Sequence, residues 1–319
     1  MAVTTTIAAL VAQHWDRVLL DNLYPSLQFY QFADKKRIPA GTGKTAWWSR
    51  YIKYAAAGGI TDGTAIGVSD LCAKRISAVV AGYGIAAMHS DFIIMTGISD
   101  VVRDSVQEVS KALALAIDNK IRGTISGSGT LLATSGKVAG TVLTGTPLQL
   151  ASIITGVNTL DSVNCKRFPD GNYVAICHPG GLAQLRASTT ANASWIDINK
   201  YANSETVGKI YRGEVGMLHG VRFIQSTACK VYGGNAALSA VHGLSGGATG
   251  ANLYMFGAGA YGAVELDGGN AKTYVKQLGS AGTADPINQN ATVGAKIYFG
   301  AVDLDCTNRL YRIAHGTTA

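Results

Sequence analysis

Between Ile98 and Ile121 the chain repeats apolar residues at the spacing of an α-helix. The repeating positions are Val102, Val106, Val109, Leu113, Ile117 and Ile121. Acidic residues lie in the first turns of this run, and basic residues followed by Gly123 lie at its end, as the helix dipole and a C-terminal cap prefer. The pattern predicts a helix at 98–122 with a length of roughly 36 Å. An ordinary long helix in a protein core would show the same pattern, so the pattern alone does not assign a special architectural role to this helix.

The first residues predict another helix, whose apolar face needs a partner. The residues of 5–23 that share this face are Ile7, Leu10, Val11, Trp15, Val18, Leu19 and Leu23. Pro25 stops the run. An isolated helix of this length is marginal in water, so the same chain or a neighbouring copy must cover the face. The candidate contacts between copies are Trp15, Leu19 and Leu23.

An aromatic stretch and a Gly-rich stretch follow. Residues 47–54 are rich in β-forming side chains and predict a strand. Residues 55–68 are small and almost without core residues, so a hairpin with this content is marginal alone. This stretch is either a mobile loop or an extension that docks on another copy. The candidate contacts for docking are Trp47, Trp48, Arg50 and Tyr54. An apolar strand at 76–88 comes next.

The middle of the chain predicts a second region. Residues 123–145 are rich in Gly, Ser and Thr and predict a loop between two lobes. Thr146-Pro147 predicts the start of a helix, with Pro at the first helical position. From there to about Gly269 the pattern predicts short helices and strands.

The composition bounds the class of protein. At 319 residues the chain has room for one large domain or two lobes. Charged residues make up only 15% and Gly occupies 39 positions, which is low charge and high Gly for a soluble monomer. Such a surface is tolerable where neighbours bury much of it, and a Gly-rich β protein that stays monomeric is the other explanation. The net charge of +7 favours polyanions nearby, although Lys and Arg are spread along the chain.

Several classes of site and location are disfavoured. The cysteines are odd in number and show no CxxC spacing, which argues against a disulfide framework and a zinc site and favours folding in the cytoplasm. They are Cys72, Cys165, Cys177, Cys229 and Cys306. No histidine pair has the spacing of a metal site, so we expect no metal and no cofactor. We also expect no signal peptide, and no membrane span, because no run of about eighteen apolar residues occurs.

Two Gly-rich patterns resemble nucleotide loops only in part. The stretch from Gly41 to Thr45 lacks the first Gly of a phosphate loop, where Ile38 stands, and a predicted strand follows it instead of a helix. Gly257, Gly259 and Gly262 fit a dinucleotide fingerprint, but the residues after them do not predict a helix. We therefore expect no nucleotide site.

No catalytic residue is predicted. Cys177 and His178 are neighbours on a predicted strand and point to opposite faces, so a core thiol beside a turn histidine is the better interpretation. A hydrolase that uses Cys177 stays as a further alternative. Glu214 and Asp285 lie in Gly-containing turns, where they can accept backbone amides or an Arg contact from another copy. Nothing pairs them as acid and base.

Segments along the whole chain are similar, in order, to one known family. At the C-terminal end they are 253–266 (LYMFGAGAYGAVEL), 275–289 (VKQLGSAGTADPINQ), 294–302 (GAKIYFGAV) and 309–313 (RLYRI). Earlier ones are 44–51, 173–186 (YVAICHPGGLAQLR) and 213–224. On these segments the chain resembles the tailed-phage major capsid proteins related to the N4 coat protein, which have the Hong Kong 97 type of shell fold.

The resemblance implies an α+β fold. Its parts are an N-terminal arm at 1–34, an extended loop at 35–72, a peripheral lobe at 73–145 and 270–319 with a spine helix at 98–122, and an axial lobe at 146–269. It implies a structural protein, not an enzyme, that self-assembles through hexamers and pentamers into the icosahedral head of a phage.

The resemblance also implies partners and a location. Scaffolding, decoration and portal proteins are candidate partners, and packaged double-stranded DNA would be held by nonspecific charge contact. No membrane is involved, and the implied location is the virion after assembly in the host cytoplasm. The alternative function is a Gly-rich surface or adhesive binding protein that works as a monomer or small oligomer.

Overall fold

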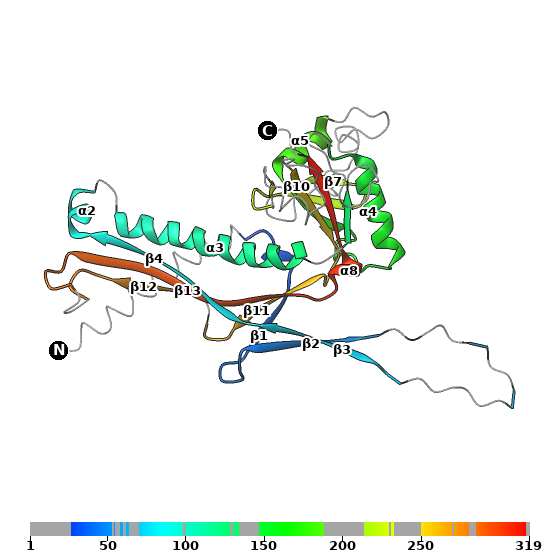
Figure 1. Cartoon of the computed structure of the whole chain (residues 1–319), viewed down its shortest axis with the longest axis horizontal. Helices are drawn as coiled ribbons and strands as arrows, with labels where there is room; N and C mark the ends of the chain where they lie inside the picture. The colour runs from blue at the N-terminus through cyan, green and yellow to red at the C-terminus, as the bar shows by residue number, and fades with distance from the viewer. Residues whose placement is uncertain are drawn as a thin grey trace.

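The computed structural model describes residues 27–52, 54, 58–59, 62–63, 70–97, 100–127, 130–133, 147–187, 214–229, 231–232, 250–269, 271–280 and 285–316. These residues form three sheets and one long helix, with shorter helices around them. Figure 1 shows an elongated molecule. One lobe lies along the long helix, a second lobe packs at the C-terminal end of that helix, and a hairpin extends beyond both.

The first sheet is built around β13 (Asn290–Asp303), the longest described strand. β4 (Ala81–Ser90) pairs with one edge of β13, and β11 (Tyr261–Leu266) and β12 (Lys272–Lys276) pair with the other edge. β1 (Asp34–Ile38) extends the sheet by parallel pairing with β11. Buried and exposed residues alternate along most of β13, as they do in a strand that is covered on one face only.

The long helix α3 (Val101–Gly127) covers one face of this sheet, and α2 (Asp91–Thr96) precedes it. The helix expected at 98–122 thus begins at Val101 and continues beyond Gly123. An interior glycine costs a helix only about 1 kcal/mol. Full burial of Ile125, beyond that glycine, offsets this cost, since burying such a side chain gains about 1.5–3 kcal/mol.

The second sheet has the strand order β5-β14-β10-β6-β8-β7, and β9 pairs with β10. The strands are β5 (Thr130–Ala133), β6 (Tyr173–Cys177), β7 (Glu214–Leu218), β8 (Val221–Gln225), β9 (Val231–Tyr232), β10 (Gly250–Phe256) and β14 (Leu310–Gly316). β6, β10 and β14 are buried at every position. α4 (Leu150–Ser162) and α5 (Pro179–Ala187) cover one face, and the last turns of α3 with Phe29 cover the other.

The start of the helix that was expected at Pro147 needs correction. α4 begins at Leu150, and Gln149 is its N-cap residue. The side chain of Leu148 is buried, and its backbone amide donates to Oε1 of Gln184 in α5 at 2.9 Å. These contacts hold the segment around Pro147 in a non-helical conformation against α5.

The strand pairing also divides the chain differently from the expected lobes at 146–269 and 270–319. β11 was expected in the second lobe but pairs with β13 of the first sheet. β14 was expected in the first lobe but lies in the second sheet, between β5 and β10. The chain changes sheet within one continuous core, where the rings of Phe256 and Tyr261 pack at 5.4 Å between centroids. Only the four-residue turn Gly257–Ala260 separates β10 from β11, and so short a turn does not mark a boundary between lobes.

The hairpin consists of β2 (Thr45–Tyr51) and β3 (Ala73–Val79), which pair with each other alone. The strand expected at 47–54 therefore begins and ends earlier. The strand expected at 76–88 is divided at Val80, whose backbone amide donates to the carbonyl of Lys44 at 2.9 Å. This bond closes the hairpin and separates β3 from β4. β1, within the range expected for the extended loop, belongs to the first sheet instead.

Candidate contact surfaces

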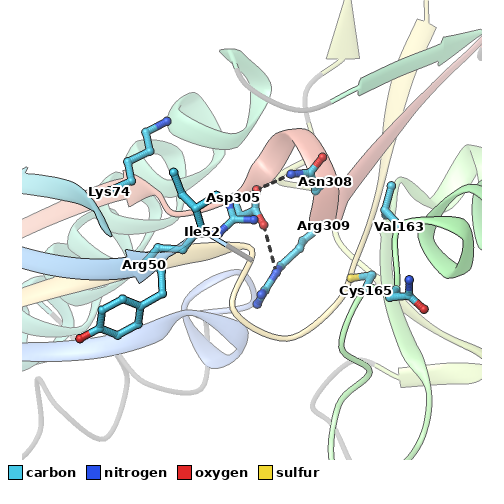
Figure 2. Close-up of a pocket in the computed structure, with 10 residues that line it drawn as sticks. Arg50, Ile52, Lys74, Val163, Cys165, Asp305, Asn308 and Arg309 are labelled. Carbon is cyan, nitrogen blue, oxygen red and sulfur yellow. Dashed lines mark hydrogen bonds and ion pairs between the residues drawn. The ribbon is translucent and has the colours of Figure 1, made fainter. Parts of the chain in front are cut away.

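The root of the hairpin is fixed to the body of the molecule by Trp48 and Arg50. The Trp48 ring lies so close to Gly262 of β11 that a Cβ atom there would come within 2.9 Å of it. The Arg50 guanidinium pairs with Asp305 at 2.5 Å, and Asp305 also pairs with Arg309 at 3.2 Å. Figure 2 shows these groups beside a cleft of about 620 Å³ between the hairpin root and the turn after α4. A charged network therefore sets the direction in which the hairpin leaves the body.

Beyond this root the hairpin carries large apolar side chains that the described chain does not cover. Tyr51, Ile52 and Tyr54 are 62%, 59% and 56% exposed. Trp47 is 48% exposed, and the guanidinium of Arg75 lies 5.0 Å from its ring centroid. A group of exposed apolar side chains marks a surface for contact with another molecule. The structure thus leaves exposed two of the predicted contacts, Trp47 at the hairpin root and Tyr54 beyond the end of β2, and also Tyr51 and Ile52, which the sequence analysis did not select.

The described chain begins with a segment that is held by Asp118 of α3. The Oδ2 atom of Asp118 accepts the backbone amides of Gln28 at 2.8 Å and Phe29 at 3.5 Å. Burial raises the pKa of Asp118 to about 6, although these backbone hydrogen bonds act in the opposite direction. The sequence analysis did not predict these hydrogen bonds between Asp118 and the segment at Gln28. The one sign of them in the sequence was an acidic residue directly after Ile117, on the apolar side of the predicted helix.

Both acidic contact candidates are used inside the chain. Glu214 is buried, and its Oε1 accepts a hydrogen bond from Arg222 at 2.7 Å, while Arg222 also pairs with Asp170. Asp285 is buried, and its Oδ2 accepts the backbone amide of Asn290 at 2.7 Å. Contact of either carboxylate with another copy stays a prediction. Outside the described residues lie three more predicted contacts, Trp15, Leu19 and Leu23.

Cys177 has the properties of a core thiol. It is fully buried, its Sγ donates to the carbonyl of His178 at 3.4 Å, and burial raises its pKa to about 12. His315 is buried on the same side of the sheet, and burial lowers its pKa to about 4. Gly181 permits this packing, because a Cβ atom there would lie within 2.8 Å of both the thiol and the imidazole. A protonated thiol that solvent does not reach is inert, which argues against the hydrolase interpretation.

Other kinds of site find no support in the described part of the chain. No cluster of three or more His, Cys, Asp or Glu side chains there could hold a metal ion. The Gly257–Gly262 turn leads into strand β11, and Gly41–Thr45 leads into strand β2, so neither precedes the helix that a nucleotide loop needs. Among the described helices, none combines the length and apolar character of a membrane span.

Comparison with solved structures identifies the fold. The capsid of Ralstonia phage GP4 is 13% identical, with 92% of both chains covered and a TM-score of 0.66. The capsid of cyanophage P-SCSP1u is 15% identical, with 92% of this chain and 89% of that chain covered and a TM-score of 0.64. The capsid of cyanophage Pam1 is 12% identical, with 93% and 92% covered and a TM-score of 0.66. No protein-family model and no curated protein matches the sequence. The predicted α+β fold of the Hong Kong 97 capsid type is therefore confirmed.

Proposed function

We propose that this chain is the major capsid protein of a tailed phage. Many copies of it form the icosahedral head shell that encloses double-stranded DNA. The observation that carries the proposal is the likeness of nearly the whole chain to phage capsid structures, at TM-scores of 0.64 to 0.66. The exposed aromatic side chains of the hairpin support it independently, because a protein that works alone gains nothing from leaving them uncovered.

In this proposal each part of the fold has a role in assembly. The first sheet with α3 forms the peripheral lobe, and α3 is its spine helix. The second sheet with α4 and α5 forms the axial lobe, through which copies join in hexamers and pentamers. The hairpin and the first 26 residues overlap neighbouring copies. Weak contacts that symmetry repeats many times hold the shell together without any one of them being strong.

The finer assignments belong to the same proposal. The resemblance of residues 253–313 supports membership in the family of the phage N4 coat protein. The net charge of +7 supports nonspecific contact with packaged DNA. We assign the chain a structural role without catalysis, a place in the virion after assembly in the host cytoplasm, and scaffolding, decoration and portal proteins as candidate partners.

The direct test is the size of the purified protein at high concentration. We expect shells or hexameric and pentameric clusters in negative-stain electron micrographs and in sedimentation velocity. A single small species at every concentration would contradict the proposal. That result would favour the Gly-rich binding protein instead.

A truncation tests the role of the N-terminal arm. Deletion of residues 1–25 is expected to abolish particles, because the apolar face with Trp15, Leu19 and Leu23 is lost as a contact. The far-ultraviolet circular dichroism and the cooperative thermal transition of the lobes should remain. Deletion of residues 317–319 is the matched control and should leave particle yield unchanged. Normal heads from the longer truncation would show that the arm has no role in assembly.

A further inference from the structure

The cleft at the hairpin root collects positive charge from both strands of the hairpin. Side chains on β2 alternate between two faces, and Ala46 and Trp48 share the face that packs against the body. Arg50 is the next residue on that face, and Lys74 of β3 is its direct cross-strand partner. Like charges that stand directly opposite each other in a sheet repel. The fold therefore places two mutually repelling cations on the wall of the cleft.

A third cation comes from the body of the molecule. Arg309, at the end of the short helix α8 (Cys306–Arg309), lines the cleft together with Arg50 and Lys74. Figure 2 shows Arg50 and Lys74 on one side of the cleft. Asp305 and Arg309 lie in its centre. The three cations thus converge on one cavity although they come from three different elements.

The carboxylate in the cleft balances these cations only in part. Asp305 is the one acidic side chain among the described residues that line it. Its two oxygens pair with Arg50 at 2.5 Å and with Arg309 at 3.2 Å, and Oδ1 also accepts the side-chain amide of Asn308 at 3.0 Å. No carboxylate of the described residues pairs with Lys74. Three cations and one carboxylate leave the cleft with a formal charge of +2.

The end of α4, on the far wall of the cleft, does not supply the missing negative charge. Asp161, in the last turn of α4, is paired with Arg167 at 2.9 Å. The backbone carbonyls of residues 159–161 accept the amides of residues 163–165, so this helix end keeps few free acceptors for Lys74. Within the part of the chain that the structure describes, the charge of the cleft therefore stays uncompensated.

The size and the donors of the cleft fit a phosphate group. Its volume of about 620 Å³ is typical of ligand sites, which span roughly 300–1,000 Å³. Guanidinium groups form forked hydrogen bonds to phosphate oxygens, and a lysine adds a compact point charge. A phosphate monoanion or dianion carries about −1.5 to −2 on average at pH 7, which matches the charge of the cleft. A carboxylate ligand would neutralise only half of that charge.

We propose that this cleft binds a phosphate group through Arg50, Lys74 and Arg309. Free phosphate and the backbone of a nucleic acid present the same chemistry to these three side chains. The bound anion screens Arg50 from Lys74 and so strengthens the root of the hairpin. The cleft lies within a single copy of the chain, so the inference goes beyond the proposed shell function and does not depend on it.

Titration of dilute, unassembled protein with inorganic phosphate tests the site. With ionic strength held constant by chloride, isothermal titration calorimetry should show saturable binding. Lys74→Gln should weaken this binding at least about fivefold, because one of the three attracting charges is lost. Lys74→Arg keeps the charge and should bind nearly as well as the unaltered protein. Lys44→Gln, at an exposed lysine directly before β2 that does not line the cleft, is the matched control and should change nothing.

Amide hydrogen exchange adds a readout of the hairpin root. Phosphate should slow exchange in β2 and β3 of the unaltered protein and of Lys44→Gln, because the bound anion makes opening of the root less frequent. The same concentration of phosphate should have less effect on Lys74→Gln. Circular dichroism and thermal unfolding check that each variant folds.

A short duplex oligonucleotide identifies the source of the phosphate group. Duplex binding that Lys74→Gln weakens and Lys44→Gln does not would assign the cleft to a nucleic acid backbone. Duplex binding that both variants retain, beside phosphate binding that needs Lys74, would assign it to free phosphate.

Two results would overturn the inference. One is the absence of saturable binding of either probe to the unaltered protein. The other is equal weakening by Lys74→Gln and Lys44→Gln with both probes, which would show general charge attraction and no site. Neither result touches the proposed shell function, because particle formation tests that function separately.

Discussion

The two main sheets of this molecule are covered to different degrees. The second sheet is a filled layer, with α4 and α5 on one face and the end of α3 with Phe29 on the other. The first sheet has α3 on one face. On the other face the hairpin root covers the end formed by β1 and β11, where Val264 is fully buried, and the end formed by β12 stays exposed with Lys272, Tyr274, Lys276, Lys296 and Tyr298. A layer buried on both sides stabilises itself, whereas a layer buried on one side keeps a surface for a partner. The comparison separates the part of the chain that folds alone from the part that assembly completes.

The largest effects on the free energy of unfolding are expected from alanine substitutions at pairs of neighbouring residues, one pair in each sheet, and these substitutions test the comparison directly. On β10, Met255→Ala and Phe256→Ala should each lower the free energy of unfolding by about 2–5 kcal/mol, because both faces of the second sheet are buried. On β13, Phe299→Ala should cost about 3–5 kcal/mol, but Tyr298→Ala on the uncovered face should cost less than about 1 kcal/mol. Urea unfolding of dilute, unassembled protein measures all four.

A loss at Tyr298 that equals the loss at Phe299 would contradict the comparison. It would mean that the same copy covers the face of β13 on which Tyr298 lies.

The free energy of unfolding should depend on pH through Asp118, which lies on helix α3 over the first sheet. Its pKa is raised to about 6 in the folded chain, above the ordinary value of 3.8, so the folded state binds the proton more tightly than the unfolded state. The resulting stabilisation is fully present below pH 3.8 and is lost as pH rises through 6, a change of about 3 kcal/mol. Urea midpoints between pH 4 and 7 measure this slope.

Asp118→Asn is the matched variant for this prediction. It keeps an oxygen that accepts the amides of Gln28 and Phe29 but does not titrate. We expect the variant to lose most of the slope over this pH range. An unchanged slope would assign it to other groups.

The hairpin root should show a smaller and more local effect. Arg50→Ala removes the pair with Asp305 and should lower global stability by no more than about 1 kcal/mol, because Arg50 is partly exposed. Amide hydrogen exchange of β2 and β3 should nevertheless become about fivefold faster, since the root opens more often. Arg75→Ala, on the other strand of the hairpin, is the control and should change exchange less. Equal exchange in both variants would show that the ion pair does not fix the hairpin.

The smallest effect is expected at Gly123 in the interior of α3. A Cβ atom at this position would have no neighbouring atom within 4 Å, so Gly123→Ala should fit without strain. Alanine favours a helix interior over glycine by about 0.5–1 kcal/mol, so thermal unfolding should move upward. A lower melting temperature would show that the helix needs flexibility at this position.

Local pattern was enough to locate several elements. The three- and four-residue repeat predicted the long helix, because an amphipathic helix carries its signature within its own sequence. The aromatic stretch at 47–54 predicted a strand, and β2 presents an exposed Trp47 there, whereas the exposed Tyr54 lies beyond the end of the strand. The order of similar segments along the chain predicted the fold class, and the superposition on capsid structures confirmed it.

The candidate contacts were predictable in kind but not in detail. Exposed Tyr51 and Ile52 escaped selection although they lie beside Tyr54, because a β-forming side chain has the same local signature whether it is buried or exposed. Glu214 and Asp285 were selected as turn residues. Glu214 instead begins strand β7, and the partners of both carboxylates inside the chain come from the strands that follow.

By itself, the sequence determined the class of fold, the long helix and the weakly charged, Gly-rich character of the hairpin end. Only the tertiary structure decided that β14 lies in the second sheet, that Asp118 holds the chain at Gln28, and that Lys272 stands opposite Lys296. The reason is physical: helix periodicity and turn chemistry act over a few residues, whereas strand partnership and charge clustering depend on residues far apart in the chain. Distant partners are chosen by the packing of the whole core, which no local stretch records.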